Sequence, residues 1–220
     1  MINEKKENEK KEQLKNEKKE QLKKYFGWTE PGEIIPVNSI IFQIIQMFNN
    51  HFIFCTFNES TKDRNDSNDL FSSNRYLWKI LTNHYFIDQS LHIRRLTDKK
   101  KGKYKSASLM HFLEYAKGLG VDAKGLGLDD TEIEILKEKL KSAEIKKYRN
   151  FVDQHVAHAD LDAPKVLLTM EEIKKCHDSI KEVFKKIGLE FFDTDMSYCL
   201  KTKLTKKQIL KNADKPFLAQ

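Results

Sequence analysis

Hydrophobic residues recur every three or four positions in four long segments of the chain, which is the pattern of helices with one buried face. These segments are residues 37–57, 75–97, 129 to about 158, and 169–187. The first segment is rich in β-branched isoleucine, so a strand is the alternative there, but its spacing favours a core helix. The pattern therefore predicts four long helices that share one core.

Residues with helix-capping side chains support these starting points. Ser106 or Ser108 can cap a shorter helix that ends near residue 117, and Asp129 or Asp130 can cap the third long helix. The last long helix begins with a capping box, Thr-Met-Glu-Glu at residues 169–172. Three of the expected helices therefore have a side chain that can satisfy their first amides.

Glycine and proline divide the chain into three predicted parts. Gly188 supplies a stop for the last long helix, and Gly27 and Pro36 bound a break before the first one. We find no convincing strand pattern with turn residues beside it, so the predicted fold class is all-α, a helical bundle. The expected parts are a charged arm at 1–26, a helical domain at 27–188 and a partly ordered tail at 189–220.

The N-terminal arm contains two nearly identical octets, EKKEQLKN at 9–16 and EKKEQLKK at 17–24. Strong helix formers and opposite charges three and four residues apart predict a helix. Leu14 and Leu22 differ by about 80° around that helix, so they form no continuous apolar stripe. The pattern favours a solvated, dispensable arm over the alternatives of a coiled coil or an RNA-binding element.

Composition narrows the class of protein. The chain has 220 residues, 39% of them hydrophobic, and a net charge of +7, which fits one core and an acidic partner such as nucleic acid. Cys55, Cys176 and Cys199 are widely separated, which indicates a reducing compartment without a disulfide framework. The N-terminus is charged where a signal peptide needs an apolar run, and polar residues interrupt the most apolar stretch. We therefore expect a cytoplasmic protein with no membrane span.

Residues 146–162 gather the side chains that best suit chemistry on phosphate esters. Arg149 can bind phosphate, and His155 and His158 can exchange protons near neutral pH. On a continuous α-helix Arg149 and His155 lie about 120° apart, so their convergence needs a helix bend or a second subunit. The alternative is an ordinary helix end in which the histidines face terminal carbonyls and Arg149 pairs with Asp153.

Metal and nucleotide sites are less favoured. His155, His158 and Asp162 are a conceivable ligand set, but the HExxH signature is absent and the histidine spacing is three, where zincins use four. The glycines between 118 and 127 lack a preceding strand and a GK[ST] ending, so triphosphate hydrolysis is not indicated. We therefore expect no metal and no cofactor.

A basic segment offers a second candidate contact with RNA. Its cations can bind phosphates, and its tyrosine can stack on a base. The alternative is a solvated loop. The candidate nucleic-acid-binding residues are Lys99, Lys100, Lys101, Lys103 and Tyr104.

The stretch from Arg149 to His155 resembles the R-x4-6-H motif of the HEPN superfamily, whose helical domains commonly act as metal-independent ribonucleases. Three further features resemble the AbiU-type abortive-infection branch of that superfamily. They are Val-Ala-His-Ala-Asp at 156–160, Arg-Leu-Thr-Asp at 95–98 followed by Ser-Ala-Ser-Leu at 106–109, and the helix start at 168–173. The resemblance covers roughly residues 36–188 and implies a HEPN-like helical bundle.

The resemblance also implies roles for these residues. Either His155 or His158 would move a proton at the ribose 2′-oxygen or the leaving 5′-oxygen, while Arg149 stabilises the transition-state charge. Asn150 would orient the phosphate or the imidazole, and Asp153 or Asp160 would fix the histidine tautomer. The implied partners are RNA, a second copy in a homodimer, and a cognate antitoxin or defence protein. The alternatives are a non-catalytic RNA-binding module and a protein-interaction module.

Overall fold

The computed structural model describes residues 2–29, 35–62, 75–99, 108–120, 127–157, 167–201 and 205–209. Every regular element in these ranges is helical, which confirms the predicted all-α fold. The elements are α1 (Ile2–Phe26), α2 (Ile40–Lys62), α4 (Arg75–Thr97), α5 (Leu109–Ala116), α6 (Asp130–Lys139), α7 (Ala143–Phe151), η1 (Val152–Ala157), α8 (Met170–Phe192) and η2 (Met196–Leu200).

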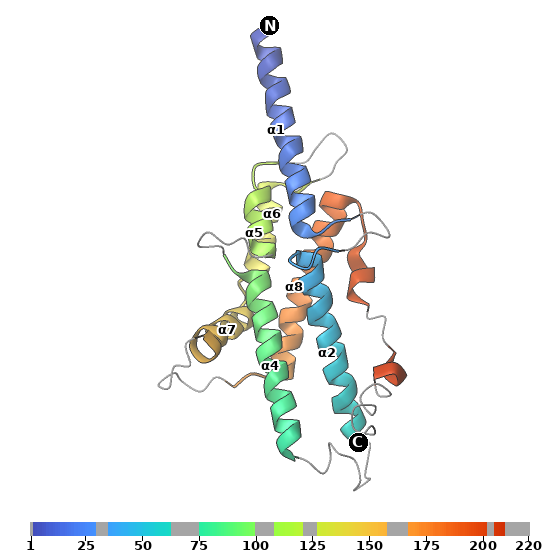
Figure 1. Cartoon of the computed structure of the whole chain (residues 1–220). Helices are drawn as coiled ribbons and strands as arrows, with labels where there is room; N and C mark the ends of the chain where they lie inside the picture. The colour runs from blue at the N-terminus through green and yellow to red at the C-terminus, as the bar shows by residue number, and fades with distance from the viewer. Residues whose placement is uncertain are drawn as a thin grey trace.

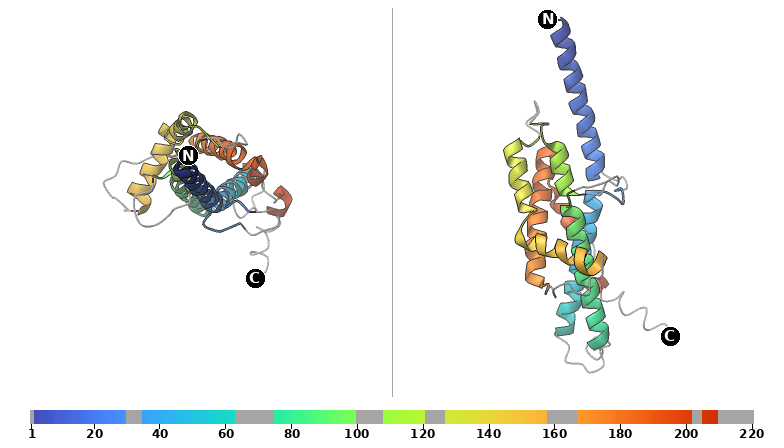
Figure 2. Two further views of the ribbon diagram at one scale, coloured as in Figure 1. Left: turned by 90° about the horizontal axis from the view of Figure 1, so that it is seen from above. Right: turned by 90° about the vertical axis from the view of Figure 1, so that its left-hand side faces the viewer.

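The long helices α2, α4 and α8 form the body of the bundle (Figure 1). Helix α4 packs against α2 on one side and against α7 on the other, and α7 crosses the bundle (Figure 2). Helices α5 and α6 lie at the end of the bundle from which α1 projects (Figure 1). One core of buried side chains runs through these helices, as the helical spacing predicted.

The last turn of α1 belongs to the core, which corrects the expectation of an arm that is solvated up to residue 26. Leu22 is 2% exposed, whereas Leu14, at the same place in the other octet, is 56% exposed. Phe26 is fully buried and its ring lies against those of Phe112, Phe184 and Phe192. The folded unit therefore begins within α1, because apolar side chains near its end meet α5 and α8.

The third predicted long helix is two helices. Helix α6 ends at Lys139, and α7 begins after Ser142, whose side chain accepts a hydrogen bond from the amide of Ile145. This N-cap satisfies the first amides of a new helix with a different direction. The single helix predicted from 129 to about 158 is therefore wrong at residues 140–142.

Gly188 does not end the last long helix, because α8 continues to Phe192. A Cβ atom at Gly188 would lie 2.2 Å from Cγ of Met196, so the glycine makes room for η2. The helix ends at Asp193, which adopts the left-handed conformation with φ of 48°. Met196 is fully buried, which places part of the predicted tail in the folded unit.

Part of α2 is long and apolar enough to cross a membrane. Its residues Ile40–Glu59 have a mean hydropathy of 1.3, and 28% of the window is buried inside the protein. Core helices pass the same test of length and composition. A single helix of this kind therefore says little about a membrane.

A buried polar cluster joins α2, α4 and α8. Nε2 of His177 lies 2.8 Å from Oε1 of Gln89, and Nδ1 of His51 lies 2.6 Å from the hydroxyl of Tyr85. The rings of His51 and His177 meet edge to face, 4.6 Å apart. Burial lowers the pKa of His177 to about 3, helped by repulsion from His51 and His92, and burial also lowers the pKa of His51. Neutral imidazoles are thus built into the core.

The two octets allow a matched test of the base of the arm. Leu22→Ala is expected to lower the free energy of unfolding by about 2–5 kcal/mol, because it leaves a cavity among buried side chains. Leu14→Ala, at the matching position of the other octet, is the control and should change the free energy of unfolding by less than about 0.5 kcal/mol. Urea denaturation of both variants measures these values. Equal effects of the two substitutions would contradict the burial of Leu22.

Acid should destabilise the fold through His177. Its folded-state pKa is lowered to about 3 from an ordinary value of 6.5, so between these values the unfolded chain binds the additional proton. Stability is therefore expected to fall below pH 6.5, by about 1.4 kcal/mol per pH unit once the unfolded-state imidazole is protonated. His177→Gln keeps a polar side chain beside Gln89 without this titration. The loss of unfolding free energy from pH 7 to pH 5 should be smaller in the variant, and identical losses would contradict this assignment.

Candidate active site

Arg149 lies near the end of α7 and is held against the end of α4. Its Nη2 donates to Oδ1 of Asp98 at 2.9 Å. A second ion pair beside it joins Arg94 of α4 to Asp153 of η1 at 2.6 Å. The side chains of Arg149 and Asp98 are 30% and 37% exposed, so solvent and a ligand can reach this pair.

These pairs replace the local pair that the sequence suggested. The sequence spacing offers Arg149 and Asp153 as partners four residues apart on one α-helix. In the structure Asp153 pairs with Arg94 of α4, and Arg149 pairs with Asp98, which directly follows α4. The reason is that α7 and η1 both pack across α4. The α-helical geometry also ends at Phe151, before Asp153. Asp98 belongs to the Arg-Leu-Thr-Asp stretch at 95–98 that resembles the AbiU-type branch, but the sequence pattern assigned it no role.

The backbone changes from α-helix to π-helix three residues after the arginine, at Val152. Residues Val152–Ala157 form η1, in which hydrogen bonds join residues five apart. The rotation of 100° per residue assumed from the sequence does not apply there, so the expected angle of about 120° between Arg149 and His155 no longer holds. Short π-helical turns within helices are frequent at functional sites.

Only part of the histidine pair belongs to the described structure. The backbone of His155 lies in η1. Its side chain, together with His158 and Asp160, lies outside the residues that the structure describes. Asn150 is exposed at the end of α7, next to Arg149. The candidate site is therefore defined by Arg149, Asn150, Asp153 and the newly found Asp98.

Tyr148 fixes the rotation of α7 about its axis. Its side chain is fully buried and its hydroxyl donates to the carbonyl of Thr169 at 2.9 Å. Lys147 pairs with Glu172 at 2.6 Å and holds the pKa of that carboxyl below its usual value. These contacts with the start of α8 place the neighbouring Arg149 on the side of α7 that faces α4.

The basic segment begins at Lys99, directly after Asp98, which pairs with Arg149. Lys99 is exposed and adjoins Asp98. Lys100, Lys101, Lys103 and Tyr104 lie outside the described residues, so their placement is not part of the site geometry. Lys99 is the one member of the candidate RNA-binding set whose position beside the Arg149–Asp98 pair is defined.

The described residues contain no group of three or more His, Cys, Asp and Glu side chains placed to hold a metal ion. The histidine side chains and Asp162 of the alternative ligand set belong to the undescribed part of the chain. The structure therefore does not test that set.

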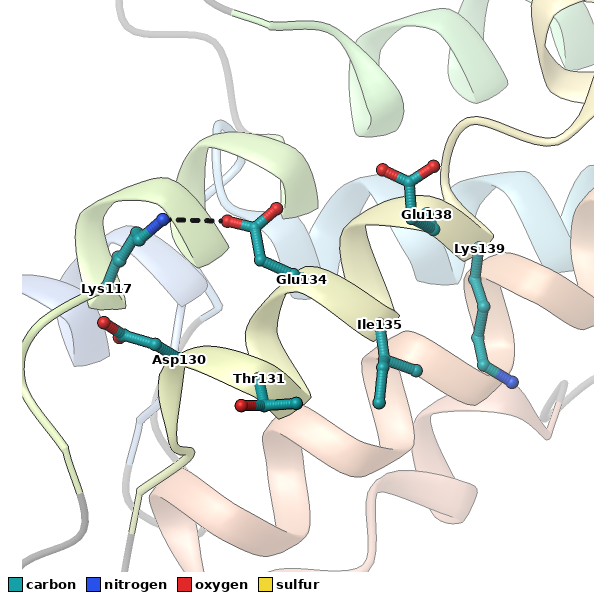
Figure 3. A pocket seen from close by; sticks show the side chains of 7 residues that line it. All are labelled: Lys117, Asp130, Thr131, Glu134, Ile135, Glu138 and Lys139. Carbon is teal, nitrogen blue, oxygen red and sulfur yellow. Dashed lines mark hydrogen bonds and ion pairs between the residues drawn. The ribbon is translucent and has the colours of Figure 1, made fainter.

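A depression with a volume of about 840 Å³ lies elsewhere on the surface, along α6 and the end of α5 (Figure 3). Ile135 contributes to its floor, and Lys117 pairs with Glu134 across its rim at 3.0 Å. None of its lining residues comes from α4, α7 or η1. It is therefore separate in sequence and structure from the ion pair of Arg149.

The structure is thus a helical bundle with an arginine in the last turn of the helix that crosses it and a histidine in the π-helical turn that follows. A model of the HEPN family described as AbiU2 matches residues 42–208, from α2 to the end of the described chain. The chain therefore belongs to the AbiU2 family of HEPN domains. Searches of curated proteins and of solved structures each found no match.

The two ion pairs of the site should contribute little to stability. All four side chains are 30–47% exposed, and exposed pairs of this kind are typically worth up to about 1 kcal/mol. Asp98→Asn and Asp153→Asn are therefore each expected to change the free energy of unfolding by less than about 1 kcal/mol. Thermal and urea denaturation test this, and a larger loss would show that the pairs hold α7 in place.

Proposed function

We propose that this protein is a metal-independent endoribonuclease of a prokaryotic defence or toxin–antitoxin type system, acting in the cytoplasm. The observation that carries the proposal is the position of Arg149. It is paired with Asp98 and partly exposed in the last turn of α7, three residues before the start of the π-helical turn that contains His155. Membership of the AbiU2 family supports a role related to abortive infection.

The proposed chemistry divides between a fixed cation and an imidazole. Arg149 binds a non-bridging oxygen of the scissile phosphate and stabilises the charge that grows in the transition state. His155 or His158 removes the proton from the ribose 2′-hydroxyl or protonates the leaving 5′-oxygen. The 2′-oxygen attacks phosphorus as the bond to the 5′-oxygen breaks, which leaves a 2′,3′-cyclic phosphate and a 5′-hydroxyl.

Asp98 holds the guanidinium without using all of its donors. It accepts from Nη2, and a guanidinium has five N–H groups in a planar fork. The remaining donors can bind a phosphate from the exposed side. The arrangement thus keeps Arg149 in one orientation before the substrate arrives, which is the preorganisation that favours catalysis.

The proposal includes a homodimer in which two Arg-His motifs face one cleft. A second copy supplies the histidine of one motif near the arginine of the other, which removes the need for both to converge on a single helix. Light scattering at several concentrations measures the oligomeric state. A dimer with an additional cognate antitoxin or defence partner fits the same proposal.

The central test uses purified full-length protein with structured and single-stranded RNA in EDTA. Wild type is expected to cut RNA, and Arg149→Ala should reduce cleavage strongly. Loss of the working histidine, tested with His155→Ala, His158→Ala and the double variant, should cost about 100-fold or more. Lys181→Ala, an exposed cation of α8, is the control for loss of positive charge and should retain cleavage.

Several outcomes would overturn the mechanism. Cleavage that survives replacement of both histidines would remove the imidazole from the reaction, and cleavage that EDTA abolishes and zinc restores would make a metal essential. Binding of RNA without cleavage would favour a binding module, a function to which the basic residues beginning at Lys99 are suited. A protein that neither binds nor cuts RNA would fit a protein-interaction module.

A further inference from the structure

Ser108 is a fully buried residue that connects the end of α4 with the start of α5. Its hydroxyl donates to the carbonyl of Asp98 at 2.7 Å and lies 3.3 Å from the carbonyl of Leu96. The same oxygen accepts from the amide of His111 at 3.3 Å as the N-cap of α5. One hydroxyl therefore satisfies carbonyls at the end of one helix and an amide at the start of the next.

Tyr25 brings α1 into the same set of contacts. The amide of Ser108 donates to the hydroxyl of Tyr25 at 3.0 Å, and the Tyr25 ring lies edge to face with His111, 5.4 Å away. Tyr25 is itself placed by the neighbouring Phe26, which is buried against α5 and α8. The base of α1 thus braces the start of α5 where it meets α4.

We propose that Ser108 and Tyr25 are positioning residues for Arg149, acting through Asp98. Ser108 holds the backbone of Asp98 at its carbonyl, and the carboxylate of that residue holds the guanidinium. Four segments distant in the sequence are thereby joined through one continuous series of hydrogen bonds. The series runs from Tyr25 of α1 through Ser108 and Asp98 to Arg149 of α7.

The physical basis is the position of Asp98 just beyond the last residue of α4. Helix ends fray readily because their last carbonyls lack partners within the helix. Here the buried Ser108 supplies such a partner, so the backbone of Asp98 is held at its carbonyl. Without this bond Asp98 and the guanidinium that it holds would sample more orientations.

The placement of Arg149 can be tested without any assay of RNA cleavage. The chain has five arginines, so the Nε–H signal of Arg149 in a ¹H–¹⁵N spectrum is identified by its loss in Arg149→Lys. Ser108→Ala, Tyr25→Phe and Asp98→Asn are each expected to shift or broaden this signal beyond its line width in wild type. Ser108→Thr keeps the hydroxyl and should return the signal toward its wild-type position.

Tyr115→Phe is the matched control. Tyr115 also joins α5 to α1 through a phenol hydroxyl, which donates to Oε1 of Gln21 at 2.6 Å, but it makes no contact with Ser108 or Asp98 in the series above. This variant should leave the Arg149 signal unchanged. If Ser108→Ala folds poorly, Tyr25→Phe still decides the proposal, because it removes one hydroxyl and keeps the ring.

The consequence for catalysis rests on the proposed function. In the RNA cleavage assay, Tyr25→Phe is expected to lower kcat by about 3–10-fold with KM nearly unchanged, since a poorly oriented arginine weakens binding of the transition state most. Tyr115→Phe should leave both constants unchanged.

The two assays distinguish failure of the positioning role from failure of the ribonuclease function. An unchanged Arg149 signal in both Ser108→Ala and Tyr25→Phe would overturn the positioning role, whatever the activity. If the Arg149 signal shifts in these variants but the wild-type protein cuts no RNA, the positioning role is retained and the ribonuclease function is rejected.

Discussion

The burial of Tyr148 is the constraint on which the candidate site depends. A helix that crosses a bundle can rotate about its own axis, and that rotation decides which side chains point toward the neighbouring helices. Tyr148 is fully buried with its hydroxyl bound to the carbonyl of Thr169, so α7 has one rotation only. The next residue, Arg149, consequently meets the end of α4, and Asn150 faces solvent.

Helix α4 contacts the core through its middle and the candidate site through its end. Toward the core, Gln89 binds His177 of α8 and the carbonyl of Met47 in α2. Near its end, Arg94 and Asp98 face α7 and η1 with opposite charges. The hydrogen bonds of Gln89 favour one packing of α4 against α2 and α8, and the charges near its end then face the crossing helix. Arg94 and Arg149 of the site thus lie on helices that pack on one another, and Asp98 directly follows one of them.

The sequence predicted the helices well because their apolar spacing is a local property. Residues 75–97 were predicted as a helix with the observed ends, and the capping box at Thr169 is formed. The break before Ser142 was missed because helix formers continue across it, although serine at this point was a usable signal. The partner of Arg149 could not be predicted, since Asp98 is 51 residues away and only the crossing of α4 and α7 brings the two together.

Leu14 and Leu22 lie in nearly identical octets, so the local sequence could not predict that only Leu22 is buried. Burial depends on what lies beside the helix. An octet adds about 12 Å of helix, and the contacts at the base belong to the octet nearest the bundle. Slippage during DNA replication could therefore duplicate or delete the outer octet and change the reach of α1 without disturbing Phe26 or Tyr25. The length of α1 outside the bundle can thus change while the contacts at its base stay the same.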